Sequence, residues 1–131
     1  MPRGVPYILV ADDNKDFREV LVAKLKAKGF TTKTASDGRE AVTIAKKTLP
    51  DLVLMDVEMP HKDGVEATLD LQQDPHTKQI KVLFVSNLGD SWPQVTEVNR
   101  RLARQMGAVD YFKKGGDLDE LVMKIHEKLG A

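Results

Sequence analysis

Five polar side chains that could carry out phosphoryl transfer stand at or just after the ends of short apolar runs. Asp12 and Asp13 follow the first run, Asp56 and Ser86 follow two later runs, and Lys114 comes soon after the last. Clustered carboxylates repel one another, by about 1–4 kcal/mol per pair at 4 Å, and a hard cation such as Mg²⁺ relieves that repulsion. A hydroxyl and an ammonium group can bind phosphoryl oxygens, and a carboxylate can accept a phosphoryl group. The residue types therefore predict a Mg²⁺-dependent phosphoryl-transfer site, provided that the fold brings them together.

The apolar runs have the character of strands in a parallel sheet. Residues 7–11, 52–55 and 82–85 are continuously apolar, which is typical of strands buried on both faces. Residues 31–35 and 109–112 are more amphipathic, as strands at a sheet edge often are.

Between these runs, apolar residues recur with the period of a helix. Five helices are expected, marked by Phe17, Val20, Leu21 and Leu25; by Ala41, Val42, Ala45 and Leu49; by the less regular stretch 63–73; by Val95, Val98, Leu102 and Met106; and by Leu118, Leu121, Val122, Ile125 and Leu129. Gly29 and Gly107 are placed to end the first and fourth helices, and Asp37 with Glu40 has capping-box spacing. Strand and helix thus alternate five times, which predicts an α/β fold with a doubly wound parallel sheet and ligands at the carboxyl ends of its strands.

The composition excludes several classes of protein. The 131 residues fit one domain, 1–131, and 20 basic with 20 acidic residues give a net charge of zero, which argues against a general nucleic-acid surface. The chain has no cysteine, so thiol catalysis, thiolate metal sites and disulfides are absent. Its apolar runs are far shorter than the roughly 20 residues that span a bilayer. We therefore expect a soluble, cytoplasmic single domain that binds neither nucleic acid nor membrane.

The polar residues and their neighbours resemble the receiver domain of two-component response regulators, in the form of a single-domain, chemotaxis-regulator-like protein. The matching positions span essentially the whole chain and are Asp12-Asp13, Asp56, Met59-Pro60, Asp63-Gly64, Ser86, Tyr111 and Lys114. The resemblance implies a flavodoxin-like (βα)5 fold with strand order 2-1-3-4-5. It also implies a signalling switch rather than a turnover enzyme.

By this resemblance, Asp56 would accept a phosphoryl group from the phosphohistidine of a histidine kinase or a histidine phosphotransfer protein. Mg²⁺ would be bound by the side chains of Asp13 and Asp56 and by the backbone carbonyl of Glu58. Asp12 would hold a metal-bound water. Mg²⁺ is the cofactor that the resemblance implies.

The resemblance also implies how the signal would leave the site. Ser86 and Lys114 would bind oxygens of the phosphoryl group, and Tyr111 would turn inward behind Ser86. These movements would change the surface over the fourth helix, the fifth strand and the fifth helix, which would contact a downstream protein target.

The sequence departs from the family pattern in three places. Asn87 follows the hydroxyl residue where the family usually has a small side chain, and Gly115-Gly116 replaces the usual proline after the lysine. The stretch from Ser86 to Tyr111 is also longer than typical, and its segment 87–93 contains Trp92, which we interpret either as a partner anchor or as a hydrophobic staple on the fourth helix. None of these changes removes a reacting group.

Four other interpretations compete with this one. Asp12 and Asp13 could merely cap the first helix. A haloacid-dehalogenase-type phosphatase also uses Mg²⁺, an aspartate nucleophile and a lysine, but it opens with an Asp-x-Asp strand and places its acidic pair last. A flavin-binding module would need hydroxyls and amides where Asp12 and Asp13 would repel a phosphate. The last alternative is a receiver-like scaffold that is not phosphorylated.

Overall fold

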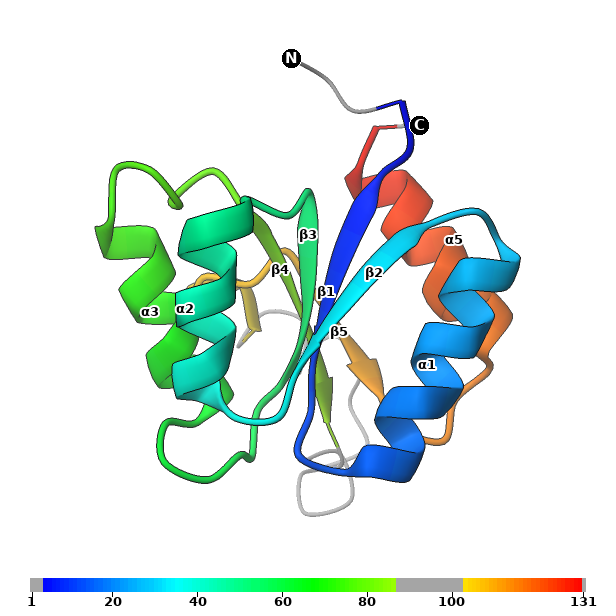
Figure 1. The fold of residues 1–131 in the computed structure, drawn as a ribbon, viewed down its shortest axis with the longest axis horizontal. Coiled ribbons are helices and arrows are strands. Elements are labelled where there is room, and N and C mark those ends of the chain that lie inside the picture. Colours follow the sequence, from blue (N-terminus) through cyan, green and yellow to red (C-terminus); the bar gives the residue numbers. More distant parts are fainter. Residues whose placement is uncertain (1–3, 87–102, 131) are drawn as a thin grey trace.

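The structure is a computed structural model that describes residues 4–86 and 103–130. Its centre is a five-stranded parallel sheet in the order β2-β1-β3-β4-β5 (Figure 1). The strands are β1 (Tyr7–Ala11), β2 (Thr31–Ala35), β3 (Leu52–Asp56), β4 (Lys81–Ser86) and β5 (Asp110–Lys113). Both the fold class and the strand order predicted from the sequence are confirmed.

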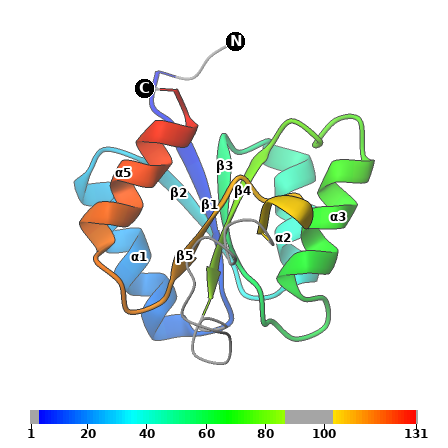
Figure 2. The same ribbon diagram turned by 180° about the vertical axis from the view of Figure 1, so that it is seen from behind.

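Helices cover both faces of the sheet. In the described residues these are α1 (Lys15–Ala27), α2 (Gly38–Thr48), α3 (Gly64–Gln73) and α5 (Leu118–Lys128). Figures 1 and 2 show α1 and α5 on one face and α2 and α3 on the other. Alternate side chains of each central strand enter opposite layers, so Ile8 and Val10 pack with α1 and α5, whereas Leu9 packs with α2 and α3. The central strands are therefore buried on both faces, as their continuous apolar sequences indicate.

The strand predictions differ from the structure by at most a residue or two at the ends. β2 is the amphipathic edge strand expected from residues 31–35, and only Ala35 in it is buried. β5 begins at Asp110 rather than at residue 109, because Asp110 is the first residue to pair with β4. The strand ends at Lys113, so Lys114 directly follows it.

The N-cap of α1 shows that one alternative interpretation, in which Asp12 and Asp13 cap this helix, is wrong. The N-cap of α1 is Asn14, whose side chain accepts a hydrogen bond from the N–H of Phe17 at 3.0 Å. Asp12 and Asp13 therefore do not cap this helix, and their carboxylates remain available to the sheet edge. The N-caps of α2, α3 and α5 are also aspartates, namely Asp37, Asp63 and Asp117.

Two residues of the predicted helical stripes do not join the core. Val20 is 53% exposed, because the side of α1 that packs on the sheet carries Phe17, Leu21 and Leu25, and Val20 lies well outside that arc. Leu49 is 44% exposed, because it adopts a left-handed conformation as the C-cap of α2 and leaves the helix axis. The other residues of these two predicted stripes are buried or half-buried as predicted.

The fourth predicted helix lies largely outside the described residues. Only its last residues, 103–105, are described, and they end as expected at Gly107, which has a φ of +99°. The N–H of Ala108 donates to the carbonyl of Ala103 at 2.9 Å, which closes the helix end. The interpretations of Asn87, of the segment 87–93 and of Trp92 fall outside the described residues.

The membrane prediction has one direct test in the structure. Among the described residues, no helix combines the length and the apolar character needed to cross a bilayer.

Candidate functional site

Three carboxylates meet at the carboxyl ends of β1 and β3, which point downward in Figure 1. Asp12 and Asp13 directly follow β1, and Asp56 is the last residue of β3. One carboxylate oxygen from each lies within 4.8 Å of the others. Asp12 is 1% exposed and Asp56 4% exposed, whereas Asp13 is exposed to solvent. The sheet therefore brings together the three acidic residues that the sequence singled out.

The backbone after β1 is fixed by local hydrogen bonds. The N–H of Asn14 donates to Asp12 Oδ1 at 2.8 Å, and Arg18 Nη1 donates to the Asp12 carbonyl at 2.8 Å. The N–H of Asp12 itself donates to the Ala35 carbonyl at 3.0 Å, which continues the β1–β2 pairing by one residue. These bonds hold the Asp12 carboxylate at the sheet edge and turn the chain into α1.

The loop between β3 and α3 supports Asp56 from the other side. The N–H of Glu58 points to Asp56 Oδ1 at 3.3 Å, and the N–H of Gly64 donates to the Val57 carbonyl at 2.8 Å. Gly64 lies so close to β3 that a Cβ atom there would overlap the carbonyl oxygen of Asp56. Only glycine allows this approach of α3 to the end of the strand.

Lys114 links the two buried carboxylates. Its Nζ lies 2.9 Å from Asp12 Oδ2 and 3.3 Å from Asp56 Oδ2, and its side chain is only 14% exposed. The same Nζ lies 4.7 Å from the centre of the Phe17 ring, within the range of a cation–π contact. Gly115, which follows, has a φ of +90°, a conformation that glycine adopts without strain. The predicted lysine therefore reaches the predicted carboxylates.

The electrostatics of the site leave it with unbalanced negative charge. Burial, and after it the charge of Asp12, raise the pKa of Asp56 to about 7, although Lys114 and the N–H of Glu58 act in the opposite direction. Burial lowers the pKa of Lys114, but its hydrogen bond and charge interactions with Asp12 and Asp56 more than offset this and hold the pKa above its ordinary value. With one ammonium group among three carboxylates, the site is suited to a divalent cation with oxygen ligands.

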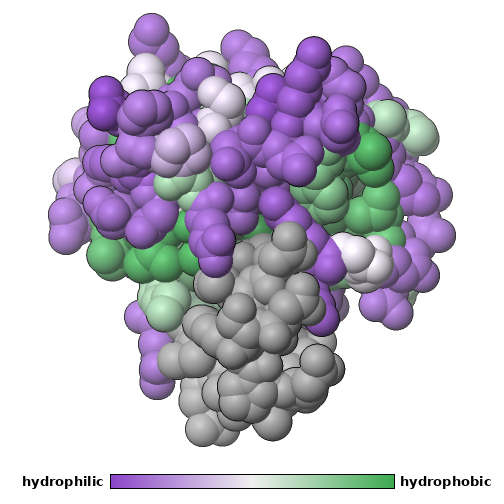
Figure 3. Space-filling view, turned by 90° about the horizontal axis from the view of Figure 1, so that it is seen from below, coloured by the Kyte–Doolittle hydropathy of each residue, from purple (hydrophilic) through white to green (hydrophobic). Residues whose placement is uncertain are grey.

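A solvent-filled hollow of about 550 Å³ opens beside the carboxylates. It is lined by Asp13, Val57, Glu58, Met59, Pro60 and Asp63. Figure 3, which looks onto this edge of the sheet, shows that the described surface is largely hydrophilic. The hollow therefore gives access from solvent to the side of the cluster that Asp13 occupies.

The structure says less about three other predicted site residues, Ser86, Tyr111 and Glu58. Ser86 ends β4, where it pairs with Lys113 of β5, and nothing is described of its side chain. Tyr111 lies in β5 and is 7% exposed, in the layer that packs against α2 and α3. Glu58 is exposed on the wall of the hollow, and its backbone carbonyl as a metal ligand stays a prediction.

Sequence reasoning missed three residues that support the site. Asn14 caps α1, Arg18 fixes the Asp12 carbonyl, and Phe17 contacts the Lys114 ammonium. The signal for Asn14 was present, because asparagine is a strong N-cap directly before the apolar periodicity of α1. Arg18 and Phe17 act through contacts that depend on how α1 lies against the sheet, and no local pattern reports them.

Comparison with known proteins agrees with the geometry. Residues 8–126 match the family model of the response regulator receiver domain. The chain is 32% identical over 124 residues to the protein PilH of Pseudomonas aeruginosa, covering 95% of this chain and 98% of PilH. It is also 32% identical over 126 residues to the regulatory protein AtoC of Escherichia coli, covering 96% of this chain but 26% of AtoC.

A solved structure shows the same likeness. The receiver domain of the sensor histidine kinase PA1611 from Pseudomonas aeruginosa, which was crystallised with a magnesium ion in its active-site cleft, superposes with a TM-score of 0.83 at 25% identity. That comparison covers 98% of this chain and 100% of the other. This chain spans less than half the length of several curated relatives that it matches, AtoC among them. The family match and the PilH likeness show that this chain belongs to the receiver domain family of two-component response regulators.

Proposed function

We propose that this receiver domain is a switch controlled by phosphorylation of Asp56. Receiver domains act in two-component signalling and are not turnover enzymes. The observation that carries the assignment of Asp56 is its placement: it is a buried strand-end carboxylate that shares Lys114 with Asp12 and lies beside the open hollow. The proposed donor is the phosphohistidine of a histidine kinase or of a histidine phosphotransfer protein.

The donor atoms of the site fit Mg²⁺. Receiver domains generally bind Mg²⁺ at an acidic pocket, and here the carboxylates of Asp12, Asp13 and Asp56 form such a cluster. Asp13 and Asp56 would bind the ion directly, Asp12 through a water, and Glu58 by its backbone carbonyl. When bound, Mg²⁺ would supply the positive charge that offsets the phosphoryl oxygens and the carboxylates.

The chain's own groups would perform the transfer. A carboxylate oxygen of Asp56 forms a bond to phosphorus while the phosphorus–nitrogen bond of phosphohistidine breaks. The imidazole leaves with that electron pair and takes up a proton from solvent, so that an acyl phosphate and a neutral imidazole result. Lys114, already held at the carboxylates, binds a phosphoryl oxygen and stabilises the charge that develops there.

The new charge would then alter the fold locally. The phosphoryl group adds acceptor oxygens at Asp56, which draws the hydroxyl of Ser86 inward and leaves room behind it for Tyr111. The surface over the fourth helix, β5 and α5 would change and contact a protein target. We propose that the chain acts as a single domain in the cytoplasm and signals through protein contact rather than through nucleic acid or membrane.

Labelling with a small phosphodonor tests this proposal. With phosphoramidate and Mg²⁺, the protein should gain one phosphoryl group, and mass spectrometry should map it to Asp56. Asp56→Asn should abolish the gain, whereas Asp16→Asn, which changes an exposed aspartate of the first turn of α1, should leave it unchanged.

Two outcomes would contradict the proposal. The first is undiminished labelling of Asp56→Asn at Asp12 or Asp13. The second is continuous turnover of a generic phosphate ester, which would favour a phosphatase of the haloacid-dehalogenase type.

A further inference from the structure

The β2 edge of the sheet presents backbone groups that are available to another strand. The N–H of Thr31 donates to Pro6 and the carbonyl of Ala35 accepts from Asp12, both at 3.0 Å, so these two residues direct their backbone groups toward β1. Since successive residues of a strand direct these groups to opposite sides, Thr32 and Thr34 direct theirs away from the sheet. Among the described strands, β2 pairs with β1 alone.

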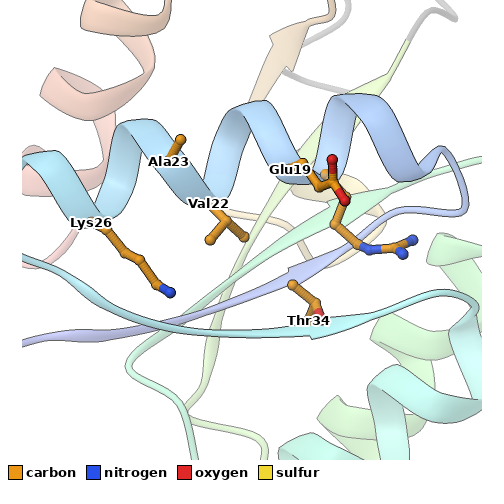
Figure 4. Close-up of a pocket in the computed structure, with 6 residues that line it drawn as sticks. Glu19, Val22, Ala23, Lys26 and Thr34 are labelled. Atoms are coloured by element: carbon orange, nitrogen blue, oxygen red, sulfur yellow. The ribbon is translucent and has the colours of Figure 1, made fainter.

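A hollow runs beside this edge. It has a volume of about 440 Å³, and Figure 4 shows Val22 and Lys26 of α1 pointing toward β2, which carries Thr34, whereas Ala23 lies on the far side of the helix. Glu19, Val22, Ala23 and Lys26 line it from α1 at the spacing of one helix face, and Thr34 lines it from β2. Thr34 is small and exposed, so the space between helix and strand is not filled.

The charges around the hollow and the edge are mostly positive. Arg18 and Lys26 lie at its two ends along α1, and Glu19 supplies one opposing charge. Lys33 is exposed on the opposite face of β2, the face that Ala35 shares with α2. Neither Lys26 nor Lys33 forms an ion pair with any other described residue. The edge is therefore complementary to a negatively charged strand.

A second copy of this chain fits the edge poorly. If two β2 strands paired antiparallel about a two-fold axis through Lys33, the two Lys33 side chains would lie directly opposite each other. Like charges in that position destabilise pairing, and a lysine on an edge strand commonly prevents it. The charge selects against self-association and in favour of an acidic partner.

We propose that β2 and the hollow beside it bind an extended acidic peptide segment of a partner protein as a sixth strand. Main-chain bonds to Thr32 and Thr34 would give affinity, and alternate side chains would enter the hollow. Eight residues along α1 from Arg18 to Lys26 rise about 12 Å, and four residues along a strand rise about 13 Å. Two glutamates four residues apart thus match the spacing of the two basic residues, with a small apolar residue between them over Val22.

The probe is the peptide acetyl-Glu-Thr-Val-Glu-Glu-amide, in which the first and last glutamates and the valine face the hollow and the fourth residue faces Lys33. We expect it to bind and to slow hydrogen exchange at the amides of Thr32 and Thr34. The same peptide with lysine in place of each glutamate should not bind. A version with methylated backbone nitrogens should also fail, because it keeps the charge but cannot donate to the edge.

Variants of the protein sharpen the test. Lys26→Glu should weaken binding about fivefold, because the exposed ion pair between Lys26 and a peptide glutamate is lost and two negative charges then face each other. Lys47→Glu, which makes the same charge change on the exposed part of α2, is the matched control and should bind as the native protein does.

Three results would overturn the proposal: equal binding of the lysine peptide, exchange protection elsewhere than at β2, or binding that Lys26→Glu leaves unchanged. A concentration-dependent dimer in sedimentation that protects the same amides would assign the edge to a second copy instead. None of the proposed variants removes an Asp56 site group, so labelling of Asp56 should persist in all of them. The failure of this proposal is therefore distinguishable from that of the phosphorylation proposal.

Discussion

Two clusters of charge with buried aspartates can be compared among the described residues, one at the carboxyl ends of the strands and one at the start of β5. In the first, Lys114 contacts Asp12 and Asp56, beside which lies Asp13. In the second, Asp110 contacts two lysines of α5: Lys124 Nζ lies 3.1 Å and Lys128 Nζ 3.7 Å from Asp110 Oδ2. The N–H of Tyr111 also donates to Asp110 at 2.8 Å.

The two clusters perturb their carboxylates in opposite directions. Burial and a neighbouring carboxylate raise the pKa of Asp56. Burial would also raise the pKa of Asp110, but the hydrogen bond from Tyr111 and the interactions with Lys124 and Lys128 outweigh it and lower the pKa. Burial is thus common to both, and the sign is decided by the neighbouring groups: a second carboxylate beside Asp56, and the Tyr111 N–H with two lysines beside Asp110. The surplus of carboxylates around Asp56 leaves a site that can bind a cation, whereas the lysines around Asp110 hold α5 against β5.

The largest expected difference between the clusters is in the labelling rate. Lys114→Ala should slow labelling of Asp56 by about 100-fold, the order seen when one group that stabilises transition-state charge is removed. Lys124→Ala, the matched change in the second cluster, should leave the rate within about twofold of native, because that lysine contacts no group of the site. Rates from intact-protein mass spectrometry measure both. Equal losses in the two variants would show that lysine removal acts through the fold rather than through the site.

Mg²⁺ should stabilise the folded protein through the first cluster only. At a hundredfold excess over its dissociation constant, the gain in free energy of unfolding is about 2.7 kcal/mol. Asp13→Ala should remove most of that gain, whereas Asp110→Asn should keep it. Urea unfolding with and without Mg²⁺ measures each value, and a native protein whose unfolding midpoint ignores millimolar Mg²⁺ would refute a metal site at these carboxylates.

Neutralising each buried aspartate should change stability in opposite directions. Without Mg²⁺ at pH 8, Asp56→Asn should stabilise the protein by about 1–2 kcal/mol, because a raised pKa marks an unfavourable charge. Asp110→Asn should destabilise it by about 1–2 kcal/mol, because the two lysines lose their partner. Unfolding in urea would show both effects, and changes of the same sign would mean that burial outweighs the charge ratio.

The smallest expected effect is a difference in pH dependence. The pKa of Asp56 is higher in the folded state than in the unfolded state, so its contribution to stability is present at low pH and is lost as the pH rises from about 4 to about 7. The pKa of Asp110 is lowered, so its contribution is present above its ordinary pKa and is lost as the pH falls below about 4.

Without Mg²⁺, the free energy of unfolding should therefore fall as the pH rises from 5 to 8, by less than about 1.4 kcal/mol per pH unit. Asp56→Asn should flatten this slope, whereas Asp110→Asn should not. A slope unchanged in Asp56→Asn would assign the pH dependence to other groups.

Local patterns in the sequence were sufficient for much of the fold. The continuous apolar runs predicted β1, β3 and β4, and the rule that ligands meet at the carboxyl ends of parallel strands predicted that Asp12, Asp13, Asp56 and Lys114 would lie together. Those inferences need only period and order along the chain.

The errors and omissions depend on longer-range geometry. Periodicity alone did not define which arc of α1 faces the sheet, so Val20 was misplaced. The second charge cluster was not anticipated, because it depends on how α5 lies against β5, which brings residues 14 and 18 positions after Asp110 to its side chain. The roles of Ser86, Tyr111 and Glu58 stay predictions.

The contact between Gly64 and the end of β3 has a consequence for how this protein tolerates mutation. Because any Cβ at this position would overlap the Asp56 carbonyl, every substitution must move either α3 or β3. In a saturation-mutagenesis screen, position 64 should therefore tolerate change as poorly as Asp56 itself, although its side chain is a single hydrogen. Sequence drift along α3 is thus limited at its first residue by a requirement for space, and a designer who recombines this loop with that of another receiver must transfer the glycine and Asp56 together.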